Sequence, residues 1–192
     1  MSVVIIDYGA GNIQSIRFAL ERLGTSAVLT NDAAVIQEAS HVIFPGVGEA
    51  SSAMEKLISS GLDTVIPSLK QPVLGICLGM QLMCTHTEER NTKGLGIFNT
   101  PVVHFDTTLN VPHMGWNNVE GTGVLFDSIP QNSHFYMVHS YYAKPNDNTI
   151  GSCTYGIAFA AALAKNNFYG TQFHPEKSDE MGAQLLKNFL SI

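Results

Sequence analysis

Two glycines flank a cysteine in the segment Gly75-Ile76-Cys77-Leu78-Gly79, and this segment constrains the fold more than any other part of the chain. The apolar residues 72–74 come directly before it, so the segment lies where a buried strand passes into a helix. Such a tight turn needs glycine two residues on either side of its centre, because the helix passes close to the strand. The central side chain then lies at a helix N-terminus, where unpaired N–H groups favour a thiolate. The segment therefore predicts a nucleophilic cysteine on an α/β scaffold.

Apolar runs and helical patterns alternate in the first half of the chain. Short runs rich in β-branched or aliphatic residues occupy positions 3–6, 27–29, 42–44 and 73–76. Between them we expect a helix capped by Asn12 with Phe18 on its apolar face, a short helix capped by Asp32, and a helix over residues 51–60. Strands that do not alternate between apolar and polar residues, and that are separated by helices, predict a parallel sheet covered on both faces.

The second half has a different pattern, with short strands and turns between residues 100 and 173. We expect strands at 102–105, 135–138, 157–163 and 168–173, followed by a final helix capped by Ser178. The sequence thus predicts one α/β domain over residues 1–192. Its central sheet is mostly parallel and flanked by helices, and antiparallel strands are added in the C-terminal half.

Charge and composition exclude several classes of partner. The net charge is −6 and Lys and Arg do not cluster, which disfavours binding to nucleic acid. No apolar run approaches the roughly 18 residues that a membrane span needs. The N-terminus lacks the basic start and cleavage site of a signal peptide, so we expect a cytoplasmic protein.

The three cysteines do not suggest a disulfide framework. We expect Cys77 and Cys84 on one helix, two turns apart, where about 10.5 Å of rise would separate them. That separation is too large for a disulfide, so Cys84 is expected to be a small buried residue, and so is Cys153.

A base and a carboxylate for Cys77 occur near the end of the chain. His174 and Glu176 directly follow the last expected strand, and alternate residues of an extended chain lie on one side. A histidine beside a cysteine can act as its base, and a carboxylate can orient that histidine. Cys77, His174 and Glu176 all follow the carboxyl ends of expected strands, and parallel sheets bind ligands at that edge.

Two further segments at this edge carry glycine. Gly46, Val47 and Gly48 offer unobstructed backbone N–H groups for an oxyanion hole, and the elbow adds the N–H of Leu78. Asp7-Tyr8-Gly9-Ala10-Gly11-Asn12 lacks the third glycine of a dinucleotide fingerprint, so we expect no cofactor there. The remaining histidines show no metal-ligand spacing, so no metal site is expected, and His139 is expected to line the cysteine site.

These motifs together resemble a known family. Gly75-Ile-Cys-Leu-Gly-Met-Gln81 with His174-Pro-Glu176 is similar to the class I, triad-type glutamine amidotransferases. Within that family, the likeness runs from residue 3 to the last helix and is to the glutaminase subunits of imidazole glycerol phosphate synthase. It is carried by the sequences around residues 7–12, 45–48, 112–117, 138–141 and 172–178.

The resemblance implies a set of roles. Cys77 would attack the carboxamide of L-glutamine, His174 would move the proton, and Glu176 would orient His174. Gln81, Ser140 and Tyr141 would hold the glutamine α-amino and carboxylate groups. Asn12, Trp116, Tyr136 and Lys177 would meet a partner at the passage for ammonia.

That implied partner is a cyclase subunit with a (β/α)8 barrel, in a heterodimer. It would use the ammonia to form imidazole glycerol phosphate and aminoimidazole carboxamide ribotide in histidine biosynthesis. One further inference does not depend on the resemblance to a family. The motifs span residues 45–176, which leaves no length for an ammonia-using domain, so we expect the acceptor on another polypeptide.

Three other functions stay open at this stage. The chain could be a stand-alone cysteine hydrolase, such as a peptidase or γ-glutamyl hydrolase, although the motifs of Trp116 and Lys177 suit a partner. It could be a non-catalytic binding subunit, although cysteine, histidine and glutamate are all present. It could also serve a paralogous synthase with another ammonia acceptor, since the acceptor binds the partner.

Overall fold

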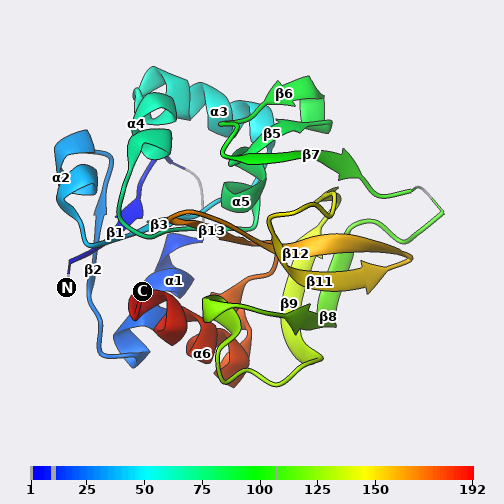
Figure 1. The fold of residues 1–192 in the computed structure, drawn as a ribbon. Coiled ribbons are helices and arrows are strands. Elements are labelled where there is room, and N and C mark those ends of the chain that lie inside the picture. The colour runs from blue at the N-terminus through cyan, green and yellow to red at the C-terminus, as the bar shows by residue number, and fades with distance from the viewer. Residues whose placement is uncertain (1, 10–11, 107) are drawn as a thin grey trace.

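The computed structural model describes residues 2–9, 12–106 and 108–192, and its strands form one mixed sheet (Figure 1). The five strands at one end run parallel in the order β2-β1-β3-β4-β13. Their bounds are β1 Val3–Ile6, β2 Ala27–Thr30, β3 His41–Phe44, β4 Val73–Ile76 and β13 Phe168–Thr171. The expected parallel core is confirmed.

Helices cover both faces of this parallel part. On one face lie α1 (Ile13–Arg22) and α6 (Asp179–Leu190); on the other lie α2 (Ala33–Glu38), α3 (Ala50–Ser59), α4 (Leu62–Ser68) and α5 (Leu78–Leu82) (Figure 1). Successive residues of β1 therefore enter different cores: Val3 and Ile5 pack with α1, and Val4 and Ile6 with α2 and α3. Burial on both faces explains why these strands are continuously apolar.

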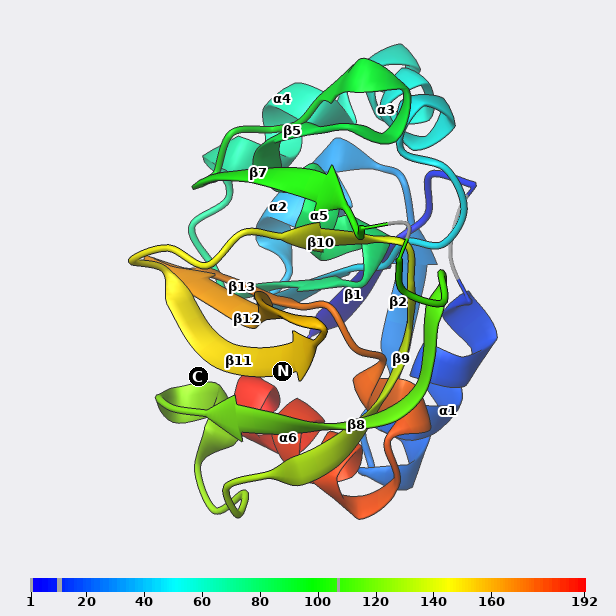
Figure 2. The same cartoon turned by 90° about the vertical axis from the view of Figure 1, so that its right-hand side faces the viewer.

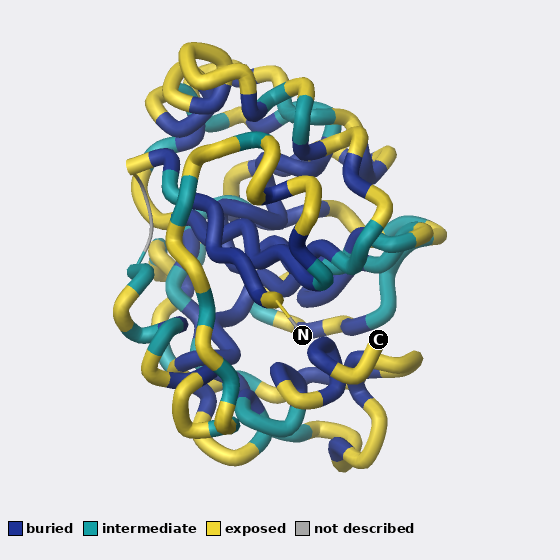
Figure 3. Tube along the Cα trace, turned by 90° about the vertical axis from the view of Figure 1, so that its left-hand side faces the viewer, coloured by how far each residue is buried: buried dark blue, intermediate teal, exposed yellow. Residues whose placement is uncertain are grey.

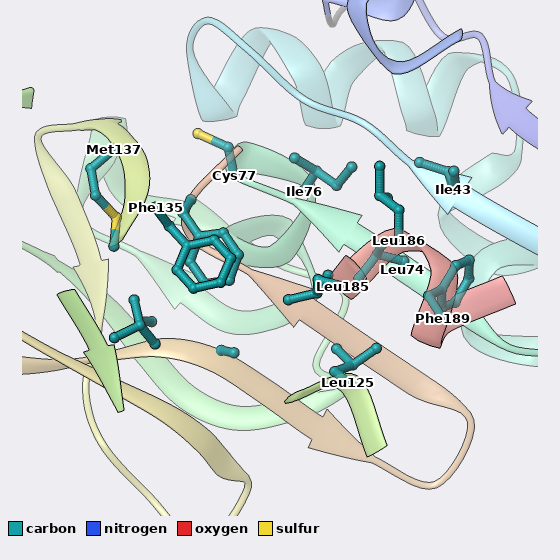
Figure 4. Close-up of a cluster of buried hydrophobic side chains, with 14 of the residues drawn as sticks. Ile43, Leu74, Ile76, Cys77, Leu125, Phe135, Met137, Leu185, Leu186 and Phe189 are labelled. Carbon is teal, nitrogen blue, oxygen red and sulfur yellow. The ribbon is translucent and has the colours of Figure 1, made fainter. Parts of the chain in front are cut away.

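The buried chain is concentrated in these central strands, and the exposed residues lie on the outer helices and loops (Figure 3). Figure 4 shows the core between the sheet and α6, in which Leu74 and Ile76 of β4 lie near Leu185 and Leu186. Cys77 follows Ile76 at the margin of this cluster, with its sulfur pointing away from it (Figure 4). The candidate nucleophile is thus held by the edge of the packed core.

The second half of the chain extends the sheet with mostly antiparallel pairs. Strand β13 joins β12 antiparallel, and the sheet continues through β10, β7, β5 and β6, while β11, β8 and β9 branch from β12 (Figure 2). Their bounds are β5 Cys84–Thr87, β6 Thr92–Lys93, β7 Phe98–His104, β8 His113–Gly121, β9 Ser133–His139, β10 Tyr141–Ala143, β11 Thr149–Tyr155 and β12 Ile157–Lys165. Short 3-10 turns occupy Glu89–Asn91, Val124–Phe126 and Pro175–Lys177.

The expectation that Cys77 and Cys84 share a helix is wrong. Helix α5 ends at Leu82, and Cys84 opens strand β5. The carbonyl of Leu82 accepts the N–H of Leu95, and the carbonyl of Met83 accepts those of Ile97 and Phe98, so these groups bond to the next segment instead of continuing the helix. Cys84 and Cys153 are nevertheless buried and unpaired, as expected.

All three residues expected as helix caps stand at the N-cap positions, but only one makes the capping hydrogen bonds. Asp32 accepts the N–H groups of Ala34 and Val35 at the start of α2. Asn12 precedes α1 but makes no capping hydrogen bond. Ser178 precedes α6, but its Oγ accepts the N–H of Tyr136 and donates to the carbonyl of His174. The tertiary contacts of Ser178 therefore replace the local cap.

Three further details differ from the sequence prediction. Phe18 is 55% exposed, because it lies about 200° around the helix from the buried Ile16. Helix α4 was not expected, since Pro67 lies within it and discourages a helix. The last strand ends at Thr171 and not at 173, because Pro175 begins a 3-10 turn. No helix in the described ranges has both the length and the apolar character to cross a membrane.

Candidate active site

The elbow at Cys77 joins β4 to α5 through a strained residue. Cys77 has φ +54° and ψ −111°, which few residues other than glycine adopt. A Cβ atom on Gly79 would lie 2.0 Å from the carbonyl oxygen of Phe44, and one on Gly75 would lie 2.8 Å from the backbone nitrogen of Met80. The two glycines are therefore required by the close passage of α5 over β3 and β4. Backbone strain of this kind is often stored at functional sites.

His174 and Glu176 form a buried pair beside this turn. Nδ1 of His174 lies 2.8 Å from Oε1 of Glu176, and both side chains are almost fully buried. The backbone of His174 is held on both sides, because its N–H donates to the carbonyl of Tyr136 and its carbonyl accepts from Ser178 Oγ. The 3-10 turn at Pro175–Lys177, and not an extended strand, brings the carboxylate back to the imidazole.

The other nitrogen of this histidine is available for chemistry. His174 Nε2 is buried and has no hydrogen-bond partner among the described residues. Burial disfavours the imidazolium, but the neighbouring Cys77 and Glu176 favour it more strongly, and the pKa of His174 is raised to about 10. Cys77 Sγ lies 3.9 Å from the carbonyl oxygen of Val138 and 3.8 Å from Nε2 of Gln172. An imidazolium beside this sulfur would stabilise its thiolate.

A cavity of about 270 Å³ opens over the cysteine and brings most of the predicted site residues together. It is lined by Val47, Gly48, Cys77, Leu78, Gln81, Glu89, Pro112, Val138, His139, Ser140, Tyr141 and His174. Glu176 does not line this cavity and contacts His174 from behind. Tyr141 lines the cavity, whereas the adjacent Tyr142 packs against Phe105 in the core.

The predicted oxyanion segment forms one wall of the cavity. Gly46 is buried, and a Cβ atom there would lie 2.6 Å from the backbone nitrogen of Gly79. Val47 and Gly48 are exposed, and Gly48 has φ +101° with open space around it. The segment is thus fixed at Gly46 and unobstructed at Gly48, beside the elbow N–H of Leu78.

Gln81 lies one turn after the cysteine and is part of a polar network. Its Nε2 donates to the carbonyl of Tyr141 at 2.9 Å and to Oε1 of Gln172 at 2.8 Å. Gln81, Ser140 and Tyr141 all line the cavity, whose volume suits a small amino acid.

The predicted partner residues do not line the cavity. Trp116 is 49% exposed and makes an edge-to-face contact with Tyr136, with ring centroids 6.1 Å apart. Lys177 Nζ lies 5.7 Å from the centre of the Tyr136 ring. Asn12 precedes α1, while Ala10 and Gly11 of the same motif lie outside the described residues.

Sequence reasoning missed Glu89 as a residue of the cavity. It belongs to the polar stretch 85–100, to which no role was assigned, and its Oε2 accepts the N–H of Ala50 at 2.8 Å. Burial raises the pKa of Glu89. A carboxylate in this wall can pair with a cationic group such as an α-ammonium. Among the described residues, no three His, Cys, Asp or Glu side chains are grouped as a metal site requires.

The chain is similar to known proteins over its whole length. The family model described as glutamine amidotransferase class-I matches residues 4–192. The chain is 50% identical to the imidazole glycerol phosphate synthase subunit HisH of Bacteroides fragilis, over 100% of both chains. It is 48% identical to the protein of the same name from Haemophilus influenzae, over 99% of this chain and 97% of that one.

Solved structures show the same fold at lower identity. A crystal structure described as a glutamine amidotransferase superposes with a TM-score of 0.78 at 17% identity, covering 99% of this chain and 98% of that chain. PurLQS from Thermotoga maritima gives a TM-score of 0.73 at 16% identity, covering 99% and 97%.

Proposed function

Since the chain belongs to the class-I glutamine amidotransferase family, we propose that it is the glutaminase subunit of an imidazole glycerol phosphate synthase. Full-length identity of about half to subunits of that name supports this assignment. The observation that carries the chemistry is the buried His174–Glu176 pair beside the strained Cys77 in one cavity. A cysteine, a histidine and an orienting carboxylate are the parts of a nucleophilic triad.

The first half of the reaction makes a thioester. His174 Nε2 takes the proton of Cys77, and the thiolate attacks the carboxamide carbon of L-glutamine. The negative oxygen that forms is stabilised by the N–H of Leu78 and by an N–H of the segment Gly46, Val47 and Gly48. His174 then gives its proton to the leaving nitrogen, so the C–N bond breaks and ammonia departs. Glu176 keeps the imidazole in the tautomer with a proton on Nδ1.

The second half releases glutamate. His174 removes a proton from a water molecule, whose oxygen attacks the thioester carbonyl in the same oxyanion site. The C–S bond breaks and Cys77 regains a proton. Gln81, Ser140 and Tyr141 hold the amino-acid end of the substrate, and Glu89 is placed to pair with its ammonium.

The ammonia passes to a cyclase with a (β/α)8 barrel, which is the partner in a cytoplasmic heterodimer. Two observations support a partner. The relatives are themselves named as subunits. Outside the cavity, the rings of Trp116 and Tyr136 meet edge to face, and the exposed Lys177 lies over the Tyr136 ring. Three unpaired cysteines suit a reducing compartment. In the complex, the cyclase would make imidazole glycerol phosphate for histidine biosynthesis.

Replacement of Cys77 tests the division of labour between the two chains. In the complex with the cyclase, Cys77→Ala abolishes glutamine-dependent synthesis, while synthesis from added ammonium continues. Cys153→Ala is the matched control, because Cys153 is buried away from the cavity and keeps both activities. Loss of the ammonium-dependent activity in Cys77→Ala as well would contradict the proposal.

A second assay separates this function from that of a stand-alone hydrolase. The isolated chain should hydrolyse glutamine slowly, and the cyclase with its nucleotide ligand should accelerate it. Full glutaminase activity in the isolated chain, unchanged by any cyclase, would favour the stand-alone hydrolase.

A further inference from the structure

Two buried histidines outside the triad face each other across strands β8 and β9. His113 and His139 are directly opposite in the antiparallel register, and each is less than a tenth exposed. Nδ1 of His113 lies 3.0 Å from Nε2 of His139. Only His139 lines the cavity. The reaction described above uses neither imidazole.

The partners of this pair determine where its protons are. Nδ1 of His139 lies 2.8 Å from the carbonyl oxygen of Tyr141, which can only accept, so this nitrogen carries a proton. If His139 is neutral, its Nε2 must accept, and Nδ1 of His113 must donate to it. Nε2 of His113 then accepts from Nδ2 of Asn117 at 3.2 Å. The second proton of that amide goes to the carbonyl of Thr154. Each hydrogen bond in the chain therefore has one donor and one acceptor.

The surroundings keep both imidazoles neutral. The ring of Tyr155 stacks on His113 at 4.1 Å, and Phe105 and Phe159 pack against His139 at 5.3 and 5.1 Å. Burial lowers the pKa of His113 and lowers that of His139 to about 3. The titratable groups that act on His139 are His113 and His174, and a proton gained by either imidazole would disfavour one on His139.

The last acceptor in this chain of hydrogen bonds belongs to the cavity wall. The carbonyl of Tyr141 accepts from His139 Nδ1 and from Gln81 Nε2, which uses both of its lone pairs. The carbonyl of Ser140 accepts the N–H of Phe105 at 3.1 Å. The backbone of residues 140–141 is therefore held at both carbonyls, and His139 supplies one of the three donors.

We propose that His139 is a positioning residue, which His113 holds in the Nδ1–H tautomer so that it fixes the Tyr141 carbonyl and the wall that receives the amino-acid end of the substrate. The statement about the wall rests on the proposed glutaminase function. The statement about the tautomer rests on the hydrogen bonds alone. Free histidine favours the Nε2–H tautomer, so two neighbouring imidazoles in the Nδ1–H form are a distinctive signature.

Nuclear magnetic resonance of the full chain, labelled with ¹⁵N at histidine, tests the tautomers directly. Long-range proton–nitrogen correlations at pH 7.5 should show a protonated Nδ1 and an unprotonated Nε2 for both residues, assigned by loss of each signal in a single variant. A protonated Nε2 on His139 would overturn the proposal. This arm does not depend on enzymatic activity.

Two amide replacements test the positioning in the complex. Asparagine at 139 places its Nδ2 near the former Nδ1, so His139→Asn keeps a donor for Tyr141. Glutamine reaches to the former Nε2 instead, so His139→Gln loses that donor. Loss of one net hydrogen bond predicts a rise in KM for glutamine of roughly three- to tenfold in His139→Gln, with kcat within about twofold. His139→Asn should recover most of this loss.

A control variant and the possible contrary results separate the positioning role of His139 from the proposed glutaminase function. His86→Gln changes a half-buried histidine of β5 outside the cavity and should leave KM unchanged. Equal KM values for the two His139 variants, or an unchanged KM in His139→Gln, would overturn the positioning role. If both His139 variants fail to fold, the tautomers measured by nuclear magnetic resonance in the wild-type chain decide whether the proposal stands. A wild-type complex without glutaminase activity would instead contradict the proposed function.

Discussion

The hydroxyl of Tyr8 donates a 2.8 Å hydrogen bond to the carbonyl oxygen of Pro45, at the start of the predicted oxyanion segment. Both residues are buried, and burial, followed by negative charge at Cys77, raises the pKa of Tyr8, so the hydroxyl stays protonated and can donate. The loop after strand β1 thus fixes the first peptide of a segment whose end, at Gly48, is exposed and unobstructed.

Tyr8→Phe removes this donor and keeps the ring. A buried carbonyl without a partner costs about 1–3 kcal/mol, so we expect a lower free energy of unfolding. If the segment forms the proposed oxyanion hole, kcat for glutamine should change more than KM, because such a hole acts on the negative oxygen of the transition state. Steady-state kinetics and denaturant unfolding measure the two effects.

Tyr169→Phe is the matched control, since its hydroxyl makes no hydrogen bond with a described residue. An effect of Tyr8→Phe on KM alone would place Tyr8 in substrate binding instead.

Gly79→Ala should prevent the elbow from forming. The added Cβ would lie 2.0 Å from the Phe44 carbonyl oxygen, so the backbone of β3 or α5 must shift. Overpacking of this kind costs about 1–3 kcal/mol or more. Gly24→Ala separates crowding from backbone strain, because Gly24 has φ +74° but open space, and should cost only about 1–2 kcal/mol. Thermal unfolding that ranks the two variants the other way would contradict the packing argument.

The His139 pKa of about 3 predicts how stability depends on pH. Below the ordinary histidine pKa of about 6.5, the unfolded chain binds a proton at this position that the folded chain does not. Acid therefore destabilises the wild type through His139 between about pH 6.5 and 3, by at most about 1.4 kcal/mol per pH unit. This contribution is absent from His139→Asn, so any stability advantage of the wild type should shrink as the pH falls from 7 to 5. A constant difference across this range would show that folding does not lower the pKa of His139.

Lys177 and Trp116 should affect coupling more than folding. Lys177 is exposed and lies over the Tyr136 ring, and its removal should cost less than about 1 kcal/mol of stability. In the complex, Lys177→Met or Trp116→Ala should change the ratio of glutaminase to synthase turnover. Lys187→Met on α6 is the control for charge. Loss of both activities in proportion, with an unchanged ratio, would count against a role at the ammonia passage.

The sequence predicts those parts of this molecule that depend on local patterns. Continuous apolar runs predict the parallel strands, because burial on both faces requires them. Strand β8 was missed, since its inward residues His113 and Val119 alternate with Trp116, Asn118 and Glu120 on a partly exposed surface.

Other features depend on distant segments that no local pattern reveals. Glu89 enters the cavity because its segment packs against the start of α3, where it accepts the N–H of Ala50. The register of β8 and β9 pairs His113 with His139 across 26 positions of sequence. His174 and Glu176 are two residues apart, so their proximity could be predicted, but the 3-10 turn that joins them follows from packing of Pro175 and Ser178.

The most direct test of the central claim is a map of cysteine labelling. A glutamine analogue with an electrophilic carbon in place of the carboxamide should be offered to the complex, and the modified peptides identified by mass spectrometry. Cys77 should be alkylated far faster than Cys84 or Cys153, because burial raises the pKa of both other thiols and neither lines the cavity. Excess glutamine should protect Cys77. Label found mainly on Cys84 or Cys153, or on Cys77 without protection by glutamine, would contradict a glutaminase that works through this cysteine.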